Sequence, residues 1–518
     1  SLFRKNLLLE IEKITADLIE VNEFTNEANY KKHKIKVCYH TEVALDLTDA
    51  ARSCNMTTDE FIQLHKSQIY TVDIVGFMPG FAYFSGLNPK LKLPRKTSPR
   101  PSVPKGSVAI ADLQTAIYPR NTPGGWNIIG KSPDTLFSVE NNPPSLFSPG
   151  DQLFIEEISL DELHRLEQKN HTQNSYRFSQ SLDDQKHAIQ ILTPGLLTSI
   201  QDYPREGLAH LAVGTGGAVD QPSMAIANTL VGNPINTEVL EITSTGPKIL
   251  FKQDSLIAWV GTNCQAKVND IEVKGNRPVW IKQNNTLTFS ILKPGFRITL
   301  AVSGGFDIPA CLEKKGSHLS ADIGFPALKK MDVIPLKNPS NFLNTPVLAK
   351  LSNTDNSVNF TKWGVPPPYL PNNGEHLLHA LPGLHLKLLS KADQSKFWES
   401  TWTISNQSNR MGIRLESDFQ PSNLPKGILS QGISMGSIQL PPSNQPIILF
   451  AEHQTTGGYP LLADIIQADF SILAQLKPGD KVRLEQVTLE TADELNVRNQ
   501  RHIENIIDSI NNNYRDSK

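Results

Sequence analysis

The sequence predicts a mainly β protein of the α+β class, built from several domains, with helices in the minority. Its 518 residues exceed what one hydrophobic core usually serves, so about three or four domains are expected. The apolar segments are short and separated by turns, for which 32 glycines and 36 prolines supply the residues. One order of strand, Gly-Gly turn and Pro-Gly turn also occurs twice, which indicates two related β domains.

The repeated layout spans Gly106–Asp151 and Gly436–Asp480. Each copy opens with Gly-Ser before an apolar run, continues through a Gly-Gly-aromatic turn, and ends with Pro-Gly-Asp before another apolar run. The opening glycine and the Gly-Gly turn are 18 positions apart in the first copy and 21 in the second. Coincidence is the alternative, because such turns are common in β proteins.

Helix and turn signals divide the chain into six segments. Helices are expected at Leu7–Glu20, Leu47–Ser53, Thr58–Ser67, Met224–Val231 and Ala492–Asn512. The stretch 165–188 is polar and lacks strand periodicity, which is typical of an interdomain linker. The expected segments are a small α/β lobe (1–68), a β domain (69–164), the linker (165–188), a second β domain (189–360), a third β domain (361–490) and a C-terminal helix or tail (491–518).

Charge and cysteine spacing exclude several classes of function. A net charge of -2 gives no electrostatic reason to expect nucleic acid or a membrane surface as a partner. The four cysteines stand far apart, so neither a zinc site nor a disulfide framework is expected, and a reducing cytoplasm fits best. No apolar run is long enough to span a bilayer. We expect a cytoplasmic protein with no metal site of its own.

Several familiar motifs are absent or out of context. The sequence contains no P-loop and no Rossmann fingerprint, and no methionine precedes a lysine, which excludes a biotin attachment site on this chain. Gly432–Gly436 matches the Gly-x-Ser-x-Gly pattern of hydrolases, but a strand follows it where that pattern needs a helix. His376 and His379 lie in an alternating β run and would face opposite sides of a sheet, so they cannot share a metal.

Three stretches carry residues suited to a site. The aromatic loop Gly76–Phe84 can line a pocket or fill the end of a barrel. The Pro-rich loop Leu93–Pro101 has three cations, which suit an oxyanion or simply face water. In Glu452–Tyr459, acid/base, amide and hydroxyl groups meet a Gly-Gly turn, although a purely structural turn is the alternative.

These motifs resemble a known pair of proteins. Residues 35–160, through Gly76–Tyr83, Val103–Val108 and Pro123–Trp126, resemble the B subunit of 5-oxoprolinase, also called allophanate hydrolase subunit 1. Residues 189–490 resemble the C subunit of 5-oxoprolinase, or allophanate hydrolase subunit 2, on Gly217–Asp220, Ser408–Gly412 and Gln454–Pro460. The same modules are consecutive in the carboxyltransferase region of urea carboxylase. The resemblance implies tandem cyclophilin-like β-barrel domains with small α/β lobes. The family usually has a fuller α/β region before the strand at Ile35–Tyr39, so either this lobe is abbreviated here or the chain lacks its natural start.

The resemblance also implies a function. A 5-oxoprolinase of this type opens the lactam of 5-oxoproline to glutamate by phosphorylating it with ATP, with Mg as the expected companion ion, and it needs a separate third subunit. One alternative is biotin-dependent carboxyl transfer to urea or a related amide, with biotin supplied by another protein. A second is a non-catalytic regulator of a histidine kinase. The expected ligand is a small amide, and a homo-oligomer is left open.

The candidate site residues follow from these motifs. No single general base is identifiable among them, which agrees with part of the site lying on another subunit. The expected catalytic residues are Gln201, Asp202, Asp220, Arg410, Gln439, Glu452, His453, Gln454 and Thr455. The expected substrate- or nucleotide-binding residues are Phe81, Tyr83, Arg95, Arg100, Lys105, Gly124, Gly125, Arg205, Gly457, Gly458 and Tyr459.

Overall fold

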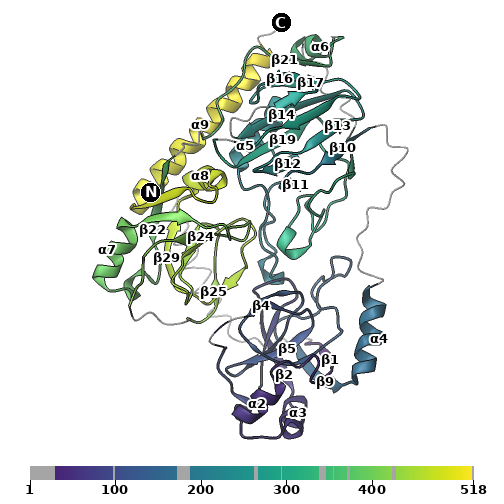
Figure 1. Ribbon diagram of the computed structural model, residues 1–518, viewed down its shortest axis with the longest axis vertical. Helices are drawn as coiled ribbons and strands as arrows, with labels where there is room; N and C mark the ends of the chain where they lie inside the picture. The colour runs from purple at the N-terminus through teal and green to yellow at the C-terminus, as the bar shows by residue number, and fades with distance from the viewer. Residues whose placement is uncertain are drawn as a thin grey trace. The chain divides into compact units, whose positions relative to one another are not determined.

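The computed structural model describes residues 30–96, 98, 100–171, 187–261, 266–292, 294–337, 346–353, 355–369, 374–422 and 427–515. The helix expected at Leu7–Glu20 lies outside the described residues, as does most of the expected linker. The chain forms two compact units (Figure 1). Unit 1 comprises residues 1–74, 82–134 and 147–170, and unit 2 comprises 75–81, 135–146 and 171–518.

Unit 1 is built on a nearly closed β-barrel. Its seven strands lie in the order β1 (Lys32–Val37), β9 (Gln152–Glu157), β2 (Tyr70–Val75), β3 (Ala82–Ser85), β6 (Gln114–Ile117), β5 (Ser107–Ala111) and β8 (Asn127–Lys131). A bridge between Cys38 and Lys131 joins the two ends of this order. Because β1 is a strand of the barrel, the lobe expected at 1–68 is not separate from the β domain that follows it.

In the described part of unit 1, three helices accompany this barrel, together with a 3-10 turn η1 (Pro89–Leu91). Helices α2 (Leu47–Ser53) and α3 (Thr58–Lys66) begin where the sequence predicted, and the Thr57–Glu60 capping box that starts α3 is formed. Helix α4 (Leu160–His171) occupies the first part of the expected linker. Leu163 is buried there and Leu166 packs beside it, so helical spacing prevails over the polar composition of 165–171.

The first part of unit 2 holds two six-stranded sheets around one core, in which Ile189 and Leu287 of one sheet join Leu240 and Leu300 of the other. This packing of two sheets is a sandwich. One sheet has the order β16 (Ile271–Val273), β15 (Ala266–Val268), β18 (Thr286–Phe289), β13 (Lys248–Phe251), β10 (Ala188–Thr193) and β20 (Val333–Pro335). The other has β11 (Leu197–Gln201), β12 (Val239–Thr243), β19 (Arg297–Val302), β14 (Ser255–Gly261), β17 (Val279–Ile281) and β21 (Val358–Phe360).

The second part of unit 2 is a closed seven-stranded barrel with a core that includes Trp402, Phe419 and Phe450. Its strands are β22 (Glu375–Pro382), β29 (Leu461–Ile465), β26 (Ser437–Gln439), β27 (Ile447–Leu449), β24 (Gly412–Glu416), β23 (Thr401–Ile404) and β30 (Lys481–Gln486). On β22, His376 is buried and His379 is half-buried, each with its own aspartate partner. The expectation that they do not share a site is therefore confirmed.

The two barrels have the same topology. Strands β1–β9 and β22–β30 correspond one to one in chain order, and the first and last strand of each set pair in parallel. Each set also contains a two-stranded ribbon outside the barrel, β4 (Arg100–Val103) with β7 (Thr122–Gly124) and β25 (Gln431–Gly432) with β28 (Thr456–Gly457). The Gly-Gly turn of each repeat lies at its ribbon. The duplication predicted from the sequence is confirmed, as is the mainly β fold class.

The remaining helices lie around unit 2 (Figure 1). Helix α9 packs against α5 through Ile506 and Ile510, which join Met224 and Leu230 in one cluster. The helices are α5 (Gln221–Leu230), α6 (Pro346–Ser352), α7 (Lys391–Glu399), α8 (Phe470–Gln475) and α9 (Leu489–Arg515), with 3-10 turns η3 (Ala209–Leu211), η4 (Leu319–Ala321), η5 (Leu386–Leu388) and η6 (Gln467–Asp469). None of the helices in the described part of the chain combines the length and the apolarity that crossing a membrane requires.

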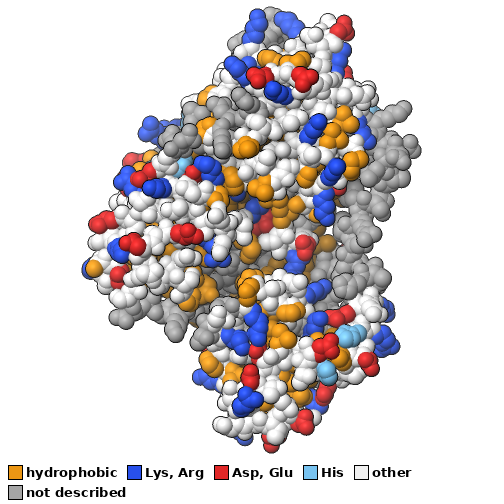
Figure 2. Space-filling model, viewed as in Figure 1, with side chains coloured by type: hydrophobic (Ala, Val, Ile, Leu, Met, Phe, Trp, Pro, Cys, Tyr) orange, Lys and Arg blue, Asp and Glu red, His pale blue; other side chains and the backbone are white. Residues whose placement is uncertain are grey.

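The surface carries both signs of charge. Lys and Arg side chains are interspersed with Asp and Glu over the visible face (Figure 2). This mixture agrees with the formal net charge of -2. A surface of this kind gives an approaching polyanion little long-range attraction.

Asp46 connects three parts of unit 1 through hydrogen bonds, and its replacement tests how much these contacts stabilise the unit. Its carboxylate accepts two hydrogen bonds from Arg100, at 2.7 and 2.9 Å, one from Lys96 at 2.8 Å and one from the Ile128 N–H at 2.8 Å. Asp46→Ala leaves these donors unpaired, and we expect it to destabilise unit 1 by about 2–3 kcal/mol. Differential scanning calorimetry would measure the change.

Asp49→Ala is the matched control, because Asp49 pairs with Arg52 at 2.9 Å while both side chains are about three-quarters exposed. Such an exposed pair contributes no more than about 0.5 kcal/mol. Equal effects of the two substitutions would contradict a stabilising role for the Asp46 cluster.

Candidate functional site

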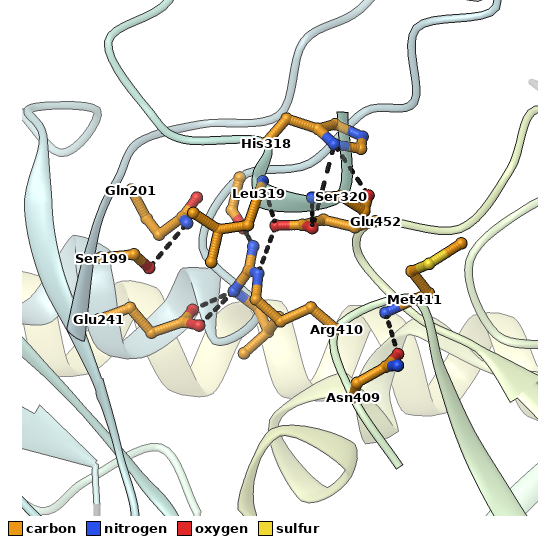
Figure 3. Close-up of polar contacts among 12 residues, drawn as sticks. Ser199, Gln201, Glu241, His318, Leu319, Ser320, Asn409, Arg410, Met411 and Glu452 are labelled. Atoms are coloured by element: carbon orange, nitrogen blue, oxygen red, sulfur yellow. Dashed lines mark hydrogen bonds and ion pairs between the residues drawn. The ribbon is translucent and has the colours of Figure 1, made fainter. Parts of the chain in front are cut away.

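A buried arginine lies at the centre of the polar residues in unit 2 (Figure 3). Arg410, in the loop between β23 and β24, donates from Nε to Glu452 Oε1 at 2.7 Å, from Nη1 to Glu241 Oε1, and from Nη2 to the Gly217 carbonyl at 2.7 Å. Glu241 lies on β12 of the sandwich, and Glu452 follows β27 of the barrel. All three nitrogens of Arg410 therefore donate to groups of this chain and join two parts of unit 2.

Glu452 is held as a carboxylate by its donors. Besides Arg410, it accepts from the Leu319 N–H at 3.1 Å and the Ser320 N–H at 2.8 Å, at the start of η4. Burial alone would raise the pKa of Glu452, but the Arg410 charge and these hydrogen bonds hold it below its ordinary value. The negative end of this network thus stays charged near neutral pH.

Next to this carboxylate are an arginine and a histidine whose polar atoms are incompletely paired. Arg205 is 1% exposed and donates from Nη2 to the carbonyls of Gly316 and, at 3.4 Å, Cys311. Its Nε and Nη1 have no acceptor within the described chain, and neither has Nε2 of the buried His318. Such buried donors without partners are rare and indicate a missing water, ion or ligand.

His318 is held neutral by its surroundings. Burial lowers the pKa of its imidazole to about 4, although Glu452, with Oε2 4.0 Å from Nδ1, acts in the opposite direction. The Ser320 hydroxyl lies 3.2 Å from Nδ1. The backbone at Gly214 lies close to the His318 ring, which only a glycine allows, because a Cβ there would lie 2.8 Å from His318 Nε2. A neutral imidazole in this place can accept a proton or donate a hydrogen bond.

Two predicted residues of β11 and its end extend this region. Gln201 donates to Ser199 Oγ at 3.0 Å, and its Oε1 has no donor among the described residues. Asp202 accepts from the Lys315 N–H at 2.8 Å, and burial raises the pKa of its carboxyl group. Gln201, Asp202 and Arg205 lie on one stretch of chain, and the Ser317 N–H donates to the Ile200 carbonyl at 2.8 Å, which brings the segment of the sequence-distant His318 beside it.

The predicted turn after Glu452 forms a second polar region. Gln454 donates from Nε2 to Gln439 Oε1 at 3.4 Å, a long contact. Thr456 Oγ1 accepts from the Phe77 N–H at 2.9 Å, and Phe77 itself has a left-handed φ of 71°. Backbone in that conformation is strained for a phenylalanine and is common at functional sites. Phe81 of the same loop is buried and packs on Phe77, with ring centroids 5.4 Å apart.

Two other predicted catalytic residues have local partners. Asp220 caps α5, accepting from the Ser223 N–H at 3.2 Å, the Ser223 hydroxyl at 2.7 Å and the Ser471 hydroxyl at 2.9 Å. Burial raises the pKa of this carboxyl group. His453 donates from Nδ1 to the Gln454 carbonyl at 2.6 Å, and burial lowers the pKa of its ring. Both side chains are used to hold their own segments.

The predicted binding residues of unit 1 gather at its ribbon. Arg100 forms an ion pair with Asp46. The guanidinium of the exposed Arg95 lies 5.9 Å from the centre of the Trp126 ring. Tyr83 packs on the same Trp126, with ring centroids 5.9 Å apart. The remaining predicted residues of this unit are Lys105, which is exposed, and the turn glycines Gly124 and Gly125.

Three residues of this region were not predicted from the sequence: Glu241, His318 and Gln431. Glu241 lies within the strand run from Glu238 and resembles any polar strand residue, and His318 lies in a segment that was interpreted only as loop. Gln431 Nε2 is buried without a partner among the described residues, opposite the Gly-Gly turn. A charged residue inside a buried strand was the one available signal, for Glu241.

The titration of His318 can be tested through stability. The folded pKa of His318, about 4, lies below its ordinary value of 6.5. Its contribution to the free energy of unfolding is therefore complete above pH 6.5 and is lost as pH falls through about 4. We expect the loss to reach about 3 kcal/mol. His318→Gln should flatten the fall of the unfolding temperature between pH 6.5 and 4, whereas His502→Gln, on the exposed face of α9, should not. Parallel pH profiles for all three proteins would show that His318 is not held neutral.

Comparison with known proteins agrees with this architecture. Residues 211–486 match the family described as carboxyltransferase domain, subdomain A and B, and residues 4–147 match carboxyltransferase domain, subdomain C and D. The crystal structure of TTHA0988 superposes with a TM-score of 0.72 at 26% identity, covering 88% of this chain and 86% of that one. The Kluyveromyces lactis urea carboxylase shares the fold, with a TM-score of 0.55 over 79% of this chain and 38% of its own.

Curated relatives match each part separately. The C subunit of 5-oxoprolinase from Escherichia coli is 33% identical over 328 residues, which is 62% of this chain and 99% of that protein. The B subunit of 5-oxoprolinase from Bacillus subtilis is 39% identical over 161 residues, 31% of this chain and 65% of that protein. The urea amidolyase of Saccharomyces cerevisiae is 28% identical over 62% of this chain and 17% of its own length. The chain therefore belongs to the carboxyltransferase-domain family, with the parts related to the B and C subunits of 5-oxoprolinase fused on one polypeptide.

Proposed function

We propose that this chain is the fused B and C component of an ATP-dependent 5-oxoprolinase that acts with a separate third subunit. Relatives of both parts are named as 5-oxoprolinase subunits, and the fusion keeps the two parts together at equal concentration. Being subunits, those relatives support a partner protein that completes the enzyme. The substrate in this proposal is 5-oxoproline, a lactam with one carboxylate.

The buried Arg205 is the observation that carries the choice of substrate. Its Nε and Nη1 have no acceptor in the described part of the chain at 1% exposure, and a guanidinium N–H left unpaired in this way forms a strong, charge-assisted hydrogen bond to a carboxylate or a phosphate. Urea has no anionic group to offer it, whereas 5-oxoproline has a carboxylate. The neutral His318 lies near Arg205 and can donate a further hydrogen bond without adding charge.

In the proposed reaction, the lactam oxygen takes the terminal phosphoryl group of ATP and ADP leaves. Water then adds to the activated ring carbon, the C–N bond breaks to give an acyl phosphate, and a second water releases phosphate and glutamate. Gln201 and Asp202 would orient the lactam, and Arg410 would hold Glu241 and Glu452 in place. The exposed cations Arg95 and Lys105 are our candidates for the ATP phosphates, which Mg would accompany.

The first test measures glutamate and ADP formed from 5-oxoproline and ATP, by this chain alone and with the third subunit from the same genome. We expect turnover only in the mixture. Arg205→Met should lower kcat/KM for 5-oxoproline by about a hundredfold, because a buried charged contact is lost. Arg52→Met, on the exposed face of α2, should leave it unchanged. Absence of ATP consumption in the mixture would contradict the proposal.

Carboxyl transfer to urea or a related amide is the second candidate, favoured by the match of both parts to carboxyltransferase domains. This reaction would need a biotin carrier on another protein. A biotinylated protein that copurifies with the chain, together with carboxylation of urea and no glutamate formation from 5-oxoproline, would support it over hydrolysis.

A further inference from the structure

In the second barrel, the backbone of Gly457 in the ribbon β25–β28 lies very close to the side chain of Gln439. A Cβ at this position would lie 2.4 Å from Gln439 Nε2 and 3.0 Å from Ile433 Cδ1. Any side chain larger than hydrogen would therefore displace Gln439. The glycine lets the backbone of the turn come close to a buried amide group, which is a typical use of glycine at a binding site.

Three polar side chains lie at this turn of the ribbon. Gln431 is the cross-strand partner of Gly457, and partners across an antiparallel ribbon have their side chains on the same face. Thr455 lies two residues before Gly457, and its carbonyl accepts from the Ile433 N–H at 3.2 Å, so the pairing of the ribbon continues to it. Gln439, on β26, approaches from the barrel. Thr456, with the opposite orientation, accepts from the Phe77 N–H.

All three side chains have a buried polar atom without a hydrogen-bond partner among the described residues: Gln431 Nε2, Gln439 Nε2 and Thr455 Oγ1. Gln439 itself is only 2% exposed. Its Oε1 accepts from Gln454 Nε2 at 3.4 Å, which turns its NH₂ group toward Gly457. Two amide donors and one hydroxyl at this turn are therefore left without a partner in the described part of this chain.

In the first barrel, the equivalent ribbon has a partner for its polar side chain. A Cβ at Gly124 would lie 2.5 Å from Tyr118 Oη, so a tyrosine hydroxyl occupies the place that the Gln439 amide has in the second barrel. Arg100 is the partner of Gly124 across that ribbon, and Asp46 pairs with it. The unpaired donors are therefore a property of the second barrel and not of the shared fold.

We propose that Gln431, Gln439 and Thr455 bind the carbonyl oxygen of an amide or lactam substrate. Uncharged donors suit a neutral carbonyl and the charge that develops on it when the group reacts, whereas a carboxylate is served better by Arg205. The segment 427–433 lies over this turn, with Ile428 N–H donating to Gly458 and Ile433 N–H to Thr455, and it must shift to admit the ligand. The identity of the carbonyl compound rests on the proposed function.

Three small probes separate the carbonyl from the carboxylate: 5-oxoproline has both, 2-pyrrolidinone has only the carbonyl, and cyclopentanecarboxylate has only the carboxylate. Ligand-observed NMR on the full chain, with and without the third subunit, gives their affinities. We expect Gln439→Glu, which keeps the shape and removes the NH₂ donor, to weaken 2-pyrrolidinone and 5-oxoproline about tenfold or more. Gln63→Glu, on the exposed face of α3, is the matched control.

Thr455→Val removes the hydroxyl at constant shape, and it replaces Gln439→Glu as the test if that variant fails to fold. Unchanged affinity for 2-pyrrolidinone in the folded variant, or no binding of this probe to the wild-type chain in either preparation, overturns the inference. Binding that depends on Gln439 without any turnover supports it and rejects the proposed 5-oxoprolinase activity. Turnover with an unchanged kcat/KM in Gln439→Glu keeps that activity and rejects the carbonyl site.

Discussion

The buried guanidinium of Arg410 binds together the two parts of unit 2 that contribute candidate site residues. It contacts Glu241 from the sandwich and Glu452 from the barrel, and its third nitrogen holds the Gly217 carbonyl. Loss of such a cation would leave two buried carboxylates unpaired, and breaking one buried pair already costs about 3–5 kcal/mol. Burial lowers the pKa of the nearby Arg205, and the charges of Asp202 and Glu452 oppose this by favouring its charged form. The geometry of η4 and His318 then follows from the hydrogen bonds to Glu452.

Duplication of the barrel explains how one topology supports two different polar environments. The ribbons β4–β7 and β25–β28 are equivalent in chain order and in pairing, yet Arg100 stands where the second ribbon has Gln431. Asp46 neutralises part of the positive charge at the first ribbon. The second ribbon has amides that find no partner among the described residues. Different side chains at an equivalent turn thus give a stabilising ion cluster in one barrel and, among the described residues, a buried group of unpaired donors in the other.

Features encoded within a few residues could be predicted from the sequence. The Thr57–Glu60 capping box, the turn glycines and the order of the two repeats depend on neighbours in the chain, and the structure has them as expected. Pairings across long separations could not be predicted. Glu241 lies 169 residues from Arg410, and Asp46 lies 54 from Arg100, so nothing local indicates that these arginines are already paired. Helix α4 was missed because its few buried leucines are hidden among charged residues.

The distribution of unpaired donors relates the fold to a choice between substrates. Arg205 offers charged N–H donors, and the turn at Gly457 offers neutral amides and a hydroxyl. In the proposed function, the carboxylate of 5-oxoproline suits Arg205 and its lactam carbonyl suits the turn, whereas urea carries only a carbonyl. Leaving a buried guanidinium without an acceptor costs more than leaving an amide, because the desolvation of a charge is larger. The discrimination between an acidic lactam and urea should therefore depend mainly on Arg205, while the reaction at the carbonyl depends on the turn.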